Sequence, residues 1–483
     1  MLSAHHAENK GINVLEDFLI AHIRNELPFV PNQGQEALLH QLGRFLLSTE
    51  EGKTFVLRGY AGTGKTSIVS ALVRAMNALK QPFCLLAPTG RAAKVLSAYS
   101  GFPAYTIHKR IYRQRQLGSE QFALSANMQQ RTLFIVDEAS MLSNTAADSS
   151  TFGSGRLLDD LIQYVFSAQG CSLLLLGDDA QLPPVGQTNS PALNVDNLRG
   201  YGLRVAEHTL TEVARQALDS GILFNATRIR NQLAAGNVHL MPDITTNTFP
   251  DIRSIYESEP FLQAMEEAYQ QVGPEETIII TRTNQRTNLY NQGIRNQILW
   301  MEGQVAQGDR IMVTKNNYFW TEKYDNLPFL ANGDMFEIVR LHNERELYGF
   351  HFVDASLHAM DYNYDIDVTL WLDTLFTDSP DANYALQKQL FVRVAEDYPE
   401  LRNRRDLWKA VMQSPYYNAL QVRFAYAVTC HKAQGGQWKR VFIDPGKVSD
   451  EQLGEDFYRW FYTALTRAQE QVFLIHFPPK KQQ

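Results

Sequence analysis

The sequence predicts an α/β protein with two parallel-sheet domains and a smaller β-rich insertion. Two parts of the chain contain short apolar runs separated by helical or polar segments, and a block with alternating polar and apolar residues interrupts the second part. Continuous apolar strands joined by helices are typical of parallel sheets that are covered on both faces. A length of 483 residues also exceeds what one hydrophobic core serves, so several structural units are expected.

The first sheet is predicted within residues 31–200, after a helical extension over residues 1–30. Its strands are the apolar runs at 55–57, 83–86, 133–136 and 172–176. Polar residues follow each run, and ligands bind at the carboxyl ends of the strands in an open α/β sheet. The polar segment 112–130, between two of these strands, is either a short hairpin or a loop.

The second sheet domain is predicted in two parts, residues 201–340 and 421–483, with strands at 277–280, 425–428, 440–443 and 471–475. Residues 341–420 form the insertion between these parts. Alternation of polar and apolar residues at 364–372 predicts a small antiparallel unit, and residues 384–412 have a helical pattern.

Residues 59–66, Gly-Tyr-Ala-Gly-Thr-Gly-Lys-Thr, fit the phosphate-binding pattern G-x-x-x-x-G-K-[ST] between a predicted strand and a predicted helix. Glycines let the backbone turn tightly, so that its N–H groups point at phosphate oxygens near the positive end of the helix. We therefore predict that this P-loop binds a nucleoside triphosphate, with Lys65 on the β- and γ-phosphates and the Thr66 hydroxyl on Mg²⁺. The residues assigned to the nucleotide are Gly59, Ala61, Gly62, Thr63, Gly64, Lys65, Thr66 and Ser67.

Three further side chains are predicted to act in hydrolysis. Asp137 and Glu138 directly follow the run 133–136 and so lie at the carboxyl end of a strand. An aspartate there supplies a contact to Mg²⁺, and the adjacent glutamate can act as general base toward water. Gln181, in the loop 177–186 after the next strand, can hydrogen-bond a γ-phosphate or a water molecule.

The order of the motifs along the chain resembles that of the superfamily-1 helicases, in the RecD-like and Dda-like branch. One such motif can occur by chance, whereas the full series in the right order does not. The resemblance covers residues 31–475 and implies two RecA-like domains, an SH3-like unit in the insertion and a strand-separating pin at 112–130. The motifs lie at residues 87–94, 106–109, 137–141, 177–184, 210–216, 332–334, 429–435 and 462–468.

The resemblance also implies roles for individual residues. Gln35 would read the adenine edge and Gly435 would contact the nucleotide. Arg215 and Arg467 would approach the γ-phosphate as arginine fingers from the second domain, because a guanidinium offers a rigid fork of donors. The alternative for either arginine is a surface or interdomain salt bridge.

Single-stranded DNA would be held through its phosphates, which hydroxyl, imidazole and backbone N–H groups contact without reading the bases. For each residue of this set, the alternative is local capping or packing. The residues assigned to DNA by the resemblance are Pro88, Thr89, Thr106, His108, Asn332, Thr429 and His431.

Composition sets limits on location and partners. A net charge of −7 and a pI near 6.0 give no overall attraction to nucleic acid, so we expect a local DNA-contact groove. Cys84, Cys171 and Cys430 lie in or beside apolar runs and are expected to be buried, unpaired thiols. The sequence has neither a signal-peptide pattern nor an apolar run of about 20 residues, so we expect a cytoplasmic protein with no membrane partner.

These features together predict an ATP- and Mg²⁺-dependent helicase that translocates on single-stranded DNA and unwinds duplex DNA as a monomer. Movement in the 5′→3′ direction is implied by the resemblance alone. The alternatives are a motor that acts on RNA or remodels protein–DNA complexes, and a nucleotide-gated subunit of a larger nuclease–helicase complex. A P-loop kinase is disfavoured, because it gives no reason for motifs as far along the chain as Arg467. One departure from the family pattern lies after the motif at 429–435, where Gly436 and Gln437 replace the Ser-Glu that relatives often have.

Overall fold

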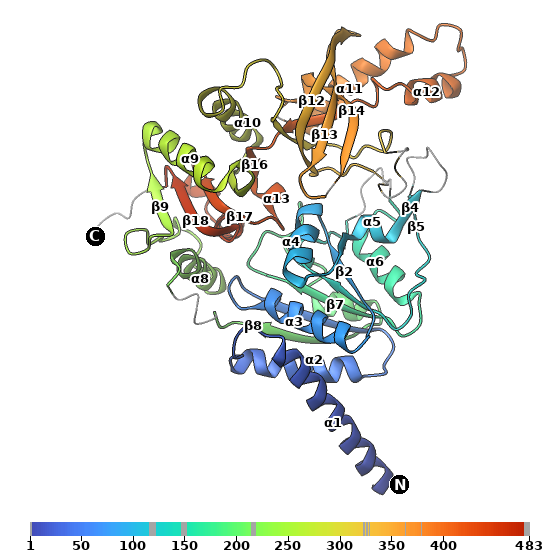
Figure 1. Ribbon diagram of the computed structural model, residues 1–483, viewed down its shortest axis with the longest axis vertical. Coiled ribbons are helices and arrows are strands. Elements are labelled where there is room, and N and C mark those ends of the chain that lie inside the picture. Colours follow the sequence, from blue (N-terminus) through green and yellow to red (C-terminus); the bar gives the residue numbers. More distant parts are fainter. Residues whose placement is uncertain are drawn as a thin grey trace.

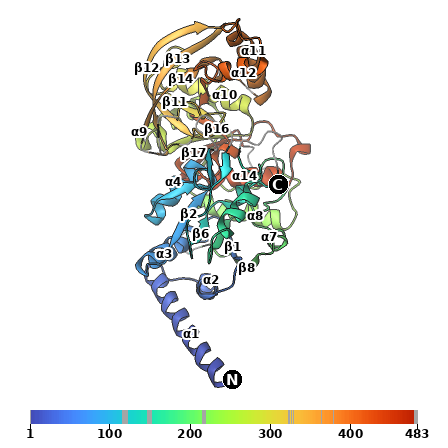
Figure 2. The same cartoon turned by 90° about the vertical axis from the view of Figure 1, so that its right-hand side faces the viewer.

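The computed structural model describes residues 2–477, apart from the segments 115–121, 146–151, 214–218, 322–323 and 325–326 and the positions 328, 363 and 378. Figure 1 shows two α/β domains and a β-barrel, with helix α1 (Leu2–Asn25) projecting from the lower end. In the turned view of Figure 2 the barrel lies at the top, the second sheet in the middle and the first sheet below it.

The first sheet is parallel throughout, in the order β3-β2-β6-β7-β1-β8. All four predicted strands are present, and β3 and β8 add one strand at each edge. The strands are β1 (Lys53–Gly59), β2 (Phe83–Ala87), β3 (Ala104–Thr106), β6 (Leu133–Val136), β7 (Ser172–Gly177) and β8 (Arg204–Leu210). The helices are α2 (Gln33–Leu47), α3 (Lys65–Ala78), α4 (Gly90–Ser100), α5 (Ile107–Ile111), α6 (Leu157–Phe166) and α7 (Val195–Gly200), with a 3-10 turn at Ala139–Met141.

Alternation along the strands sends apolar side chains to both faces of the first sheet. In β1, Phe55 and Leu57 pack with Leu72 of α3, whereas Val56 packs in a separate cluster with Leu161 of α6. Because helices cover both faces, the central strands β2, β6 and β7 are continuous apolar runs. This core holds the strand ends, and therefore the loops that follow them, in fixed positions.

The second sheet is also parallel, in the order β16-β10-β17-β18-β9. Its strands are β9 (Ile252–Ile255), β10 (Thr277–Thr281), β16 (Ala427–Thr429), β17 (Trp438–Asp444) and β18 (Ala468–Ile475). Its helices are α8 (Gly221–Ala234), α9 (Ser258–Val272), α10 (Asn284–Gly293), α13 (Cys430–Ala433) and α14 (Glu455–Leu465). A π-helical turn (Ile294–Ile298) continues α10, and 3-10 turns lie at Pro274–Glu276 and Asp450–Gln452.

The insertion contains a closed barrel of strands β11 (Arg310–Val313), β12 (Met335–Leu347), β13 (Phe350–Ala359), β14 (Asp365–Trp371) and β15 (Leu420–Phe424). This small barrel fits the expected SH3-like unit. A 3-10 turn (Leu372–Thr374) and the helices α11 (Pro380–Ala395) and α12 (Arg404–Met412) connect β14 to β15. The helices pack on the barrel through a cluster that includes Phe352, Trp371, Leu390 and Val411.

Three predicted boundaries need correction. The barrel extends beyond 341–420 at both ends, because β11 and β15 pair with each other across the whole insertion. Residues 201–210 belong to the first sheet rather than the second, since β8 pairs with β1. Of the predicted strand 425–428, only Ala427 and Val428 lie in β16, and the two residues before them connect β15 to β16.

The segment 112–130 contains an antiparallel pair, β4 (Tyr112–Gln114) and β5 (Phe122–Leu124). The residues that join these strands lie outside the described part of the chain. Within the described residues, no helix has the length and apolarity needed to cross a membrane.

Candidate active site

The P-loop turns tightly between β1 and α3. Gly62 and Gly64 have φ angles of 75° and 86°, in the left-handed region that favours glycine. The Lys65 ammonium donates to the carbonyl oxygens of Gly59 and, at 3.0 Å, Tyr60. Helix α3 begins at Lys65, so its positive end faces the loop.

Gln35 lies directly behind this loop. Its side chain is 2% exposed and completes a capping box with Asn32 at the start of α2. Its Nε2 donates to the carbonyl oxygen of Thr63 at 2.9 Å, and its Oε1 accepts the N–H of Asn32 at 3.0 Å. Gln35 therefore braces the P-loop in this structure, and its contact with adenine stays a prediction.

Asp137 and Glu138 lie at the carboxyl end of β6, facing Lys65. Glu138 has a φ of 52°, and its N–H donates to Oδ1 of Asp137 at 2.9 Å. Burial, followed by the neighbouring charge of Glu138, raises the pKa of Asp137 to about 6, although Lys65 and Arg467 act in the opposite direction. The ionised carboxylate is thus held at a cost to stability, as expected of a group that awaits a cation.

This raised pKa predicts that Asp137→Asn stabilises the protein. A folded-state pKa above the ordinary 3.8 means that ionised Asp137 destabilises the folded state above pH 6, and that this penalty fades as the pH falls toward 3.8. We expect the variant to raise the melting temperature at pH 7.5 by about 2–4 °C in a buffer free of divalent cations. The gain should shrink by roughly half at pH 5.0.

Thermal unfolding followed by circular dichroism at the two pH values checks this expectation. Asp17→Asn, an exposed position on α1, is the matched control and should leave the melting temperature unchanged. A lower melting temperature for Asp137→Asn than for the wild type at pH 7.5 would show that the ionised carboxylate is stabilising.

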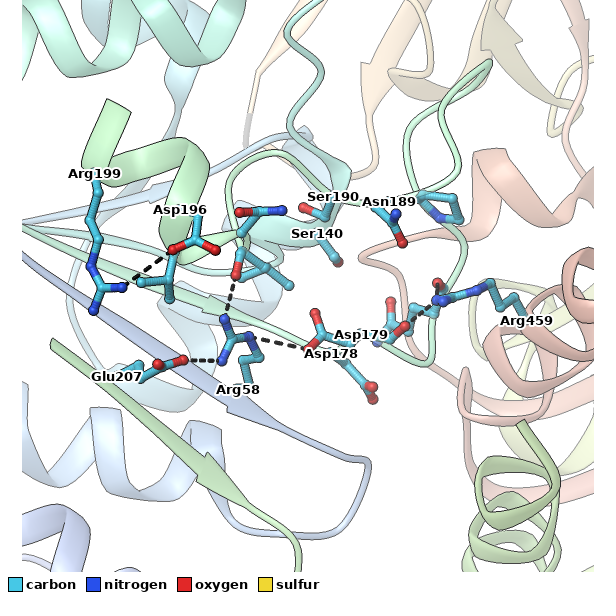
Figure 3. A pocket seen from close by; sticks show the side chains of 15 residues that line it. Arg58, Ser140, Asp178, Asp179, Asn189, Ser190, Asp196, Arg199, Glu207 and Arg459 are labelled. Atoms are coloured by element: carbon cyan, nitrogen blue, oxygen red, sulfur yellow. Dashed lines mark hydrogen bonds and ion pairs between the residues drawn. The ribbon is translucent and has the colours of Figure 1, made fainter. Parts of the chain in front are cut away.

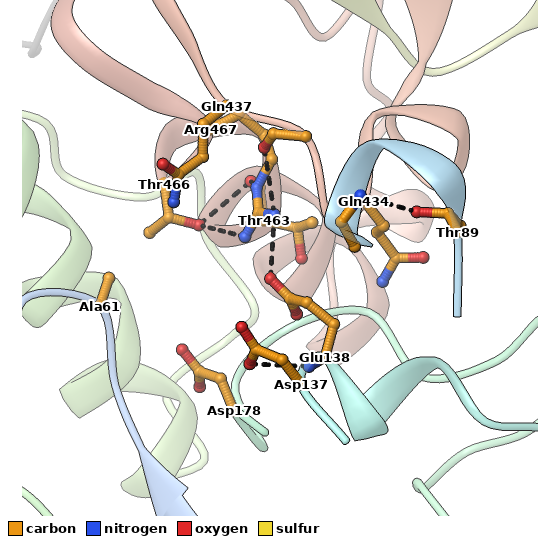
Figure 4. Close-up of polar contacts among 12 residues, drawn as sticks. Ala61, Thr89, Asp137, Glu138, Asp178, Gln434, Gln437, Thr463, Thr466 and Arg467 are labelled. Carbon is orange, nitrogen blue, oxygen red and sulfur yellow. Dashed lines mark hydrogen bonds and ion pairs between the residues drawn. The ribbon is translucent and has the colours of Figure 1, made fainter. Parts of the chain in front are cut away.

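Arg467 enters the same site from the second domain (Figure 4). It is 3% exposed, and its Nη1 lies 3.4 Å from Oε1 of Glu138. Its Nε donates to the carbonyl oxygen of Thr463 at 3.1 Å, which fixes the guanidinium. Gln181 bridges the two charges: with its amide turned to satisfy both, nitrogen donates to Oε2 of Glu138 at 3.2 Å and oxygen accepts from Nη2 of Arg467 at 3.0 Å.

Helix α14 and the segment around α13 hold the Gln181 loop from the second domain. The Thr463 hydroxyl accepts the N–H of Leu182 at 2.8 Å, and Nε2 of Gln434 donates to the carbonyl oxygen of Leu182 at 2.7 Å. Sequence reasoning missed these two residues. Both lie within motifs that it identified, but their partners depend on how the domains meet.

Two cavities adjoin at this junction. The nucleotide cavity, about 460 Å³, is lined by the P-loop, Asp137, Glu138, Gln181, Gly435 and Arg467. A larger polar cavity of about 630 Å³ shares Asp178 and Gln181 with it (Figure 3). In the larger cavity, Arg58 forms ion pairs with Asp179 at 3.2 Å and with Glu207 at 2.6 Å. Its charge is therefore already balanced by side chains of the cavity lining. The catalytic candidates gather in the smaller cavity.

The donors of the nucleotide cavity fit Mg²⁺. The Thr66 hydroxyl and the Asp137 carboxylate both line it, and hard oxygen ligands are those that Mg²⁺ prefers. The described residues contain no group of three or more metal-binding side chains. Arg215 lies outside the described residues, so the structure places only one of the two predicted arginine fingers.

Three of the predicted DNA contacts lie at or just beyond the carboxyl ends of strands in the two sheets. Thr89 lies just after β2, and Thr106 is the last residue of β3. Each side-chain hydroxyl caps a helix by accepting the backbone N–H of the residue three positions later, at 3.2 Å. Thr429 ends β16, the edge strand of the second sheet. The two domains meet closely at the start of α4, since a Cβ on Gly435 would lie 3.2 Å from the Thr89 hydroxyl.

The remaining DNA candidates differ in exposure. His431 is exposed next to Thr429, whereas the His108 ring packs edge-on against Phe152 at 5.0 Å. Burial lowers the pKa of His108 to about 4, so its ring is neutral. Oδ1 of Asn332 accepts from the Lys432 ammonium at 2.6 Å. Pro88 lies between β2 and the Thr89 cap.

Cys84, Cys171 and Cys430 are buried free thiols, as expected.

Known families match both halves of this arrangement. The AAA domain family matches residues 31–241, and the UvrD-like helicase C-terminal domain matches residues 424–475. The uncharacterized protein R530 of Acanthamoeba polyphaga mimivirus is 22% identical over 92% of this chain and 99% of its own length. The ATP-dependent DNA helicase dda of Enterobacteria phage T4 is 24% identical over 87% of this chain and 93% of its own.

A third relative and two solved structures are more limited comparisons. The ATP-dependent RecD2 DNA helicase of Deinococcus radiodurans is 29% identical over 40% of this chain, which spans 24% of that protein. Pif1 helicases solved at forked duplex DNA share 14% identity over 92% of each chain, with a TM-score of 0.47. Bacteroides Pif1 with ADP-AlF3 and single-stranded DNA shares 15% identity over 92% of each chain, with a TM-score of 0.45. The two family matches and the curated relatives show that this chain is similar to superfamily-1 helicases of the RecD- and Dda-like kind.

Proposed function

We propose that this protein is an ATP-dependent helicase that moves 5′→3′ along single-stranded DNA, as a monomer, and unwinds duplex DNA. The observation that carries the proposal is the position of Arg467. It reaches Glu138 and Gln181 of the first domain from the second domain, inside the cavity that the P-loop lines. A hydrolytic site built from both domains makes the distance between them depend on the nucleotide.

ATP with Mg²⁺ would supply the phosphoryl group and the charge that the site is built to neutralise. Lys65 and the P-loop N–H groups would hold its phosphates, and Thr66 and Asp137 would hold the cation. Glu138 can accept a proton from water, and Arg467 can donate to charge that develops on the transferred group. Because Arg467 comes from the second domain, hydrolysis requires the cleft to be closed.

The close approach of Gly435 to Thr89 supports a DNA path across both domains. Thr89 and Thr106 lie on the first domain, whereas Thr429 and His431 lie on the second. A strand held by both sets would be drawn along as the domains close and open. Neutral hydroxyl and imidazole groups suit a protein of net charge −7, since they hold phosphates without a large positive field.

The β4–β5 pair is the candidate for a strand-separating pin. Its base is fixed by an aromatic cluster in which Phe122 contacts Phe152 at 4.9 Å and Tyr318 at 5.0 Å. A base anchored between the first domain and the connection from β11 to β12 of the barrel would resist the force of an arriving duplex.

Tail polarity tests the proposed direction. We expect the purified protein with ATP to displace a labelled strand from a duplex with a 5′ single-stranded tail at least about tenfold faster than from one with a 3′ tail, because movement in one direction approaches the duplex from one side only. A blunt duplex is the control and should not be unwound. Faster unwinding from a 3′ tail would overturn the direction, and ATP hydrolysis stimulated by RNA but not by DNA would favour the RNA motor.

A further inference from the structure

Tyr462 connects the two sheet domains at the nucleotide cavity. It lies on α14 and is 1% exposed. Its hydroxyl accepts the backbone N–H of Ala61 at 3.0 Å and donates to Oδ2 of Asp178 at 2.7 Å. Ala61 belongs to the P-loop and Asp178 directly follows β7, and both are labelled in Figure 4. One hydroxyl of the second domain therefore joins two loops of the first.

The donor and acceptor roles in the two hydrogen bonds of Tyr462 are fixed by the chemistry of its partners. A phenol has a single proton to donate and lone pairs that accept, so it donates to the carboxylate and accepts from the amide. Burial and the charge of Asp178 raise the pKa of Tyr462 well above its usual value, which keeps the proton in place. Oδ1 of Asp178 accepts the N–H of Ala180 at 3.0 Å, so the carboxylate is itself fixed.

Arg467 depends on the same structural unit. Its guanidinium is held by the carbonyl oxygen of Thr463, the neighbour of Tyr462 on α14. The position of α14 against the first domain therefore sets where Arg467 lies relative to Glu138. The Tyr462 hydroxyl contacts the P-loop through the N–H of Ala61. Lys65 uses other atoms of the loop, the carbonyl oxygens of Gly59 and Tyr60.

We propose that Tyr462 is a positioning residue for ATP hydrolysis: its hydroxyl holds the P-loop and the Asp178 carboxylate in register with Arg467. This inference rests on the proposed function. The P-loop would keep its phosphate contacts without this hydroxyl, because Lys65 and α3 belong to the first domain. Nucleotide affinity should therefore persist in its absence, while the rate of hydrolysis falls.

Helix α14 provides a matched control. Tyr458 lies one turn before Tyr462, is 0% exposed, and its hydroxyl donates to the carbonyl oxygen of Leu240 at 2.8 Å. That contact stays within the second domain. Tyr458→Phe thus removes a buried hydroxyl from the same helix without changing a contact to the P-loop.

The experiment compares Tyr462→Phe with Tyr458→Phe and the wild type. The quantities measured are kcat for ATP hydrolysis at saturating single-stranded DNA, the Kd of a fluorescent non-hydrolysable ATP analogue, and the melting temperature. We expect Tyr462→Phe to lower kcat by about tenfold or more, as for a lost positioning contact, with less than about a threefold change in Kd. Tyr458→Phe should keep kcat within about twofold of the wild type. Its change in melting temperature should be comparable to that of Tyr462→Phe, because each variant removes one buried hydroxyl from α14.

Equal kcat values for the two variants, or a loss of affinity as large as the loss of kcat, would overturn the role of Tyr462. The wild type separates this inference from the proposed function. If the wild type does not hydrolyse ATP with DNA present, the proposed function fails. If it does and Tyr462→Phe matches it, only the positioning role fails.

Discussion

Replacing Lys65 with alanine is expected to reduce DNA-stimulated ATP hydrolysis at least about 100-fold, because the site would lose the ammonium that we propose contacts the β- and γ-phosphates. The fold should persist. Lys65 donates only to two carbonyl oxygens of its own loop, Gly59 and Tyr60, among the hydrogen bonds of the described residues. We therefore expect a melting temperature within about 2–4 °C of the wild type.

Arg74→Ala is the control for this variant. Arg74 is an exposed cation on the same helix, α3, and its Nη2 donates to the carbonyl oxygen of Tyr99 at 3.1 Å. It should leave kcat unchanged. Steady-state hydrolysis with saturating single-stranded DNA measures both variants, and turnover by Lys65→Ala near the wild-type rate would remove the P-loop from the proposed mechanism.

Arg467→Ala is expected to lower kcat by about 10³-fold, the size seen when an arginine that stabilises the transferring phosphoryl group is removed. Nucleotide affinity should change only a few-fold, since the P-loop remains intact. Arg467→Lys should recover little of the rate, because an ammonium cannot donate to two partners in the fixed geometry of a guanidinium. It keeps a positive charge beside Glu138 and so also controls for folding.

Arg253→Ala provides the matched control in the same domain, at an exposed position on the edge strand β9. Rapid-quench measurement of a single turnover separates hydrolysis from product release. If Arg467→Ala instead weakened nucleotide binding 100-fold and left single-turnover hydrolysis unchanged, the arginine would serve in binding rather than catalysis.

The central strands of the two sheets could be predicted from local pattern because each is short, apolar and buried on both faces. The edge strands β3, β8 and β9 were not predicted, because they contain exposed or polar positions. The run 133–136, for example, is β6, and Asp137 follows it at the sheet edge as expected. The barrel limits could not be predicted in this way. Strand β11 belongs to the barrel because it pairs with β12 and with β15, and β15 is distant from it in sequence. The alternation of polar and apolar residues within β14 does not indicate the pairing of β11 with β15.

The two halves of the active site differ in the same respect. The P-loop is a local sequence feature, whereas Arg467 was expected only from the resemblance to a family. The contacts of Tyr462 with Ala61 and Asp178 had no sequence signal, because they depend on how one domain packs against the other. The hydrogen bond from the buried Gln35 side chain to the P-loop likewise had no sequence signal, because it depends on how α2 packs against the loop.

Strand displacement by variants altered in opposite domains is the most direct measurement of the shared site. The wild type, Lys65→Ala and Arg467→Ala are compared on a 5′-tailed duplex with ATP, after binding of each to single-stranded DNA has been verified. A site completed by both domains predicts that the wild type displaces the labelled strand and that neither variant does, although both bind DNA. Displacement by Arg467→Ala at the wild-type rate would show that the first domain hydrolyses ATP alone, and would contradict a site shared between the domains.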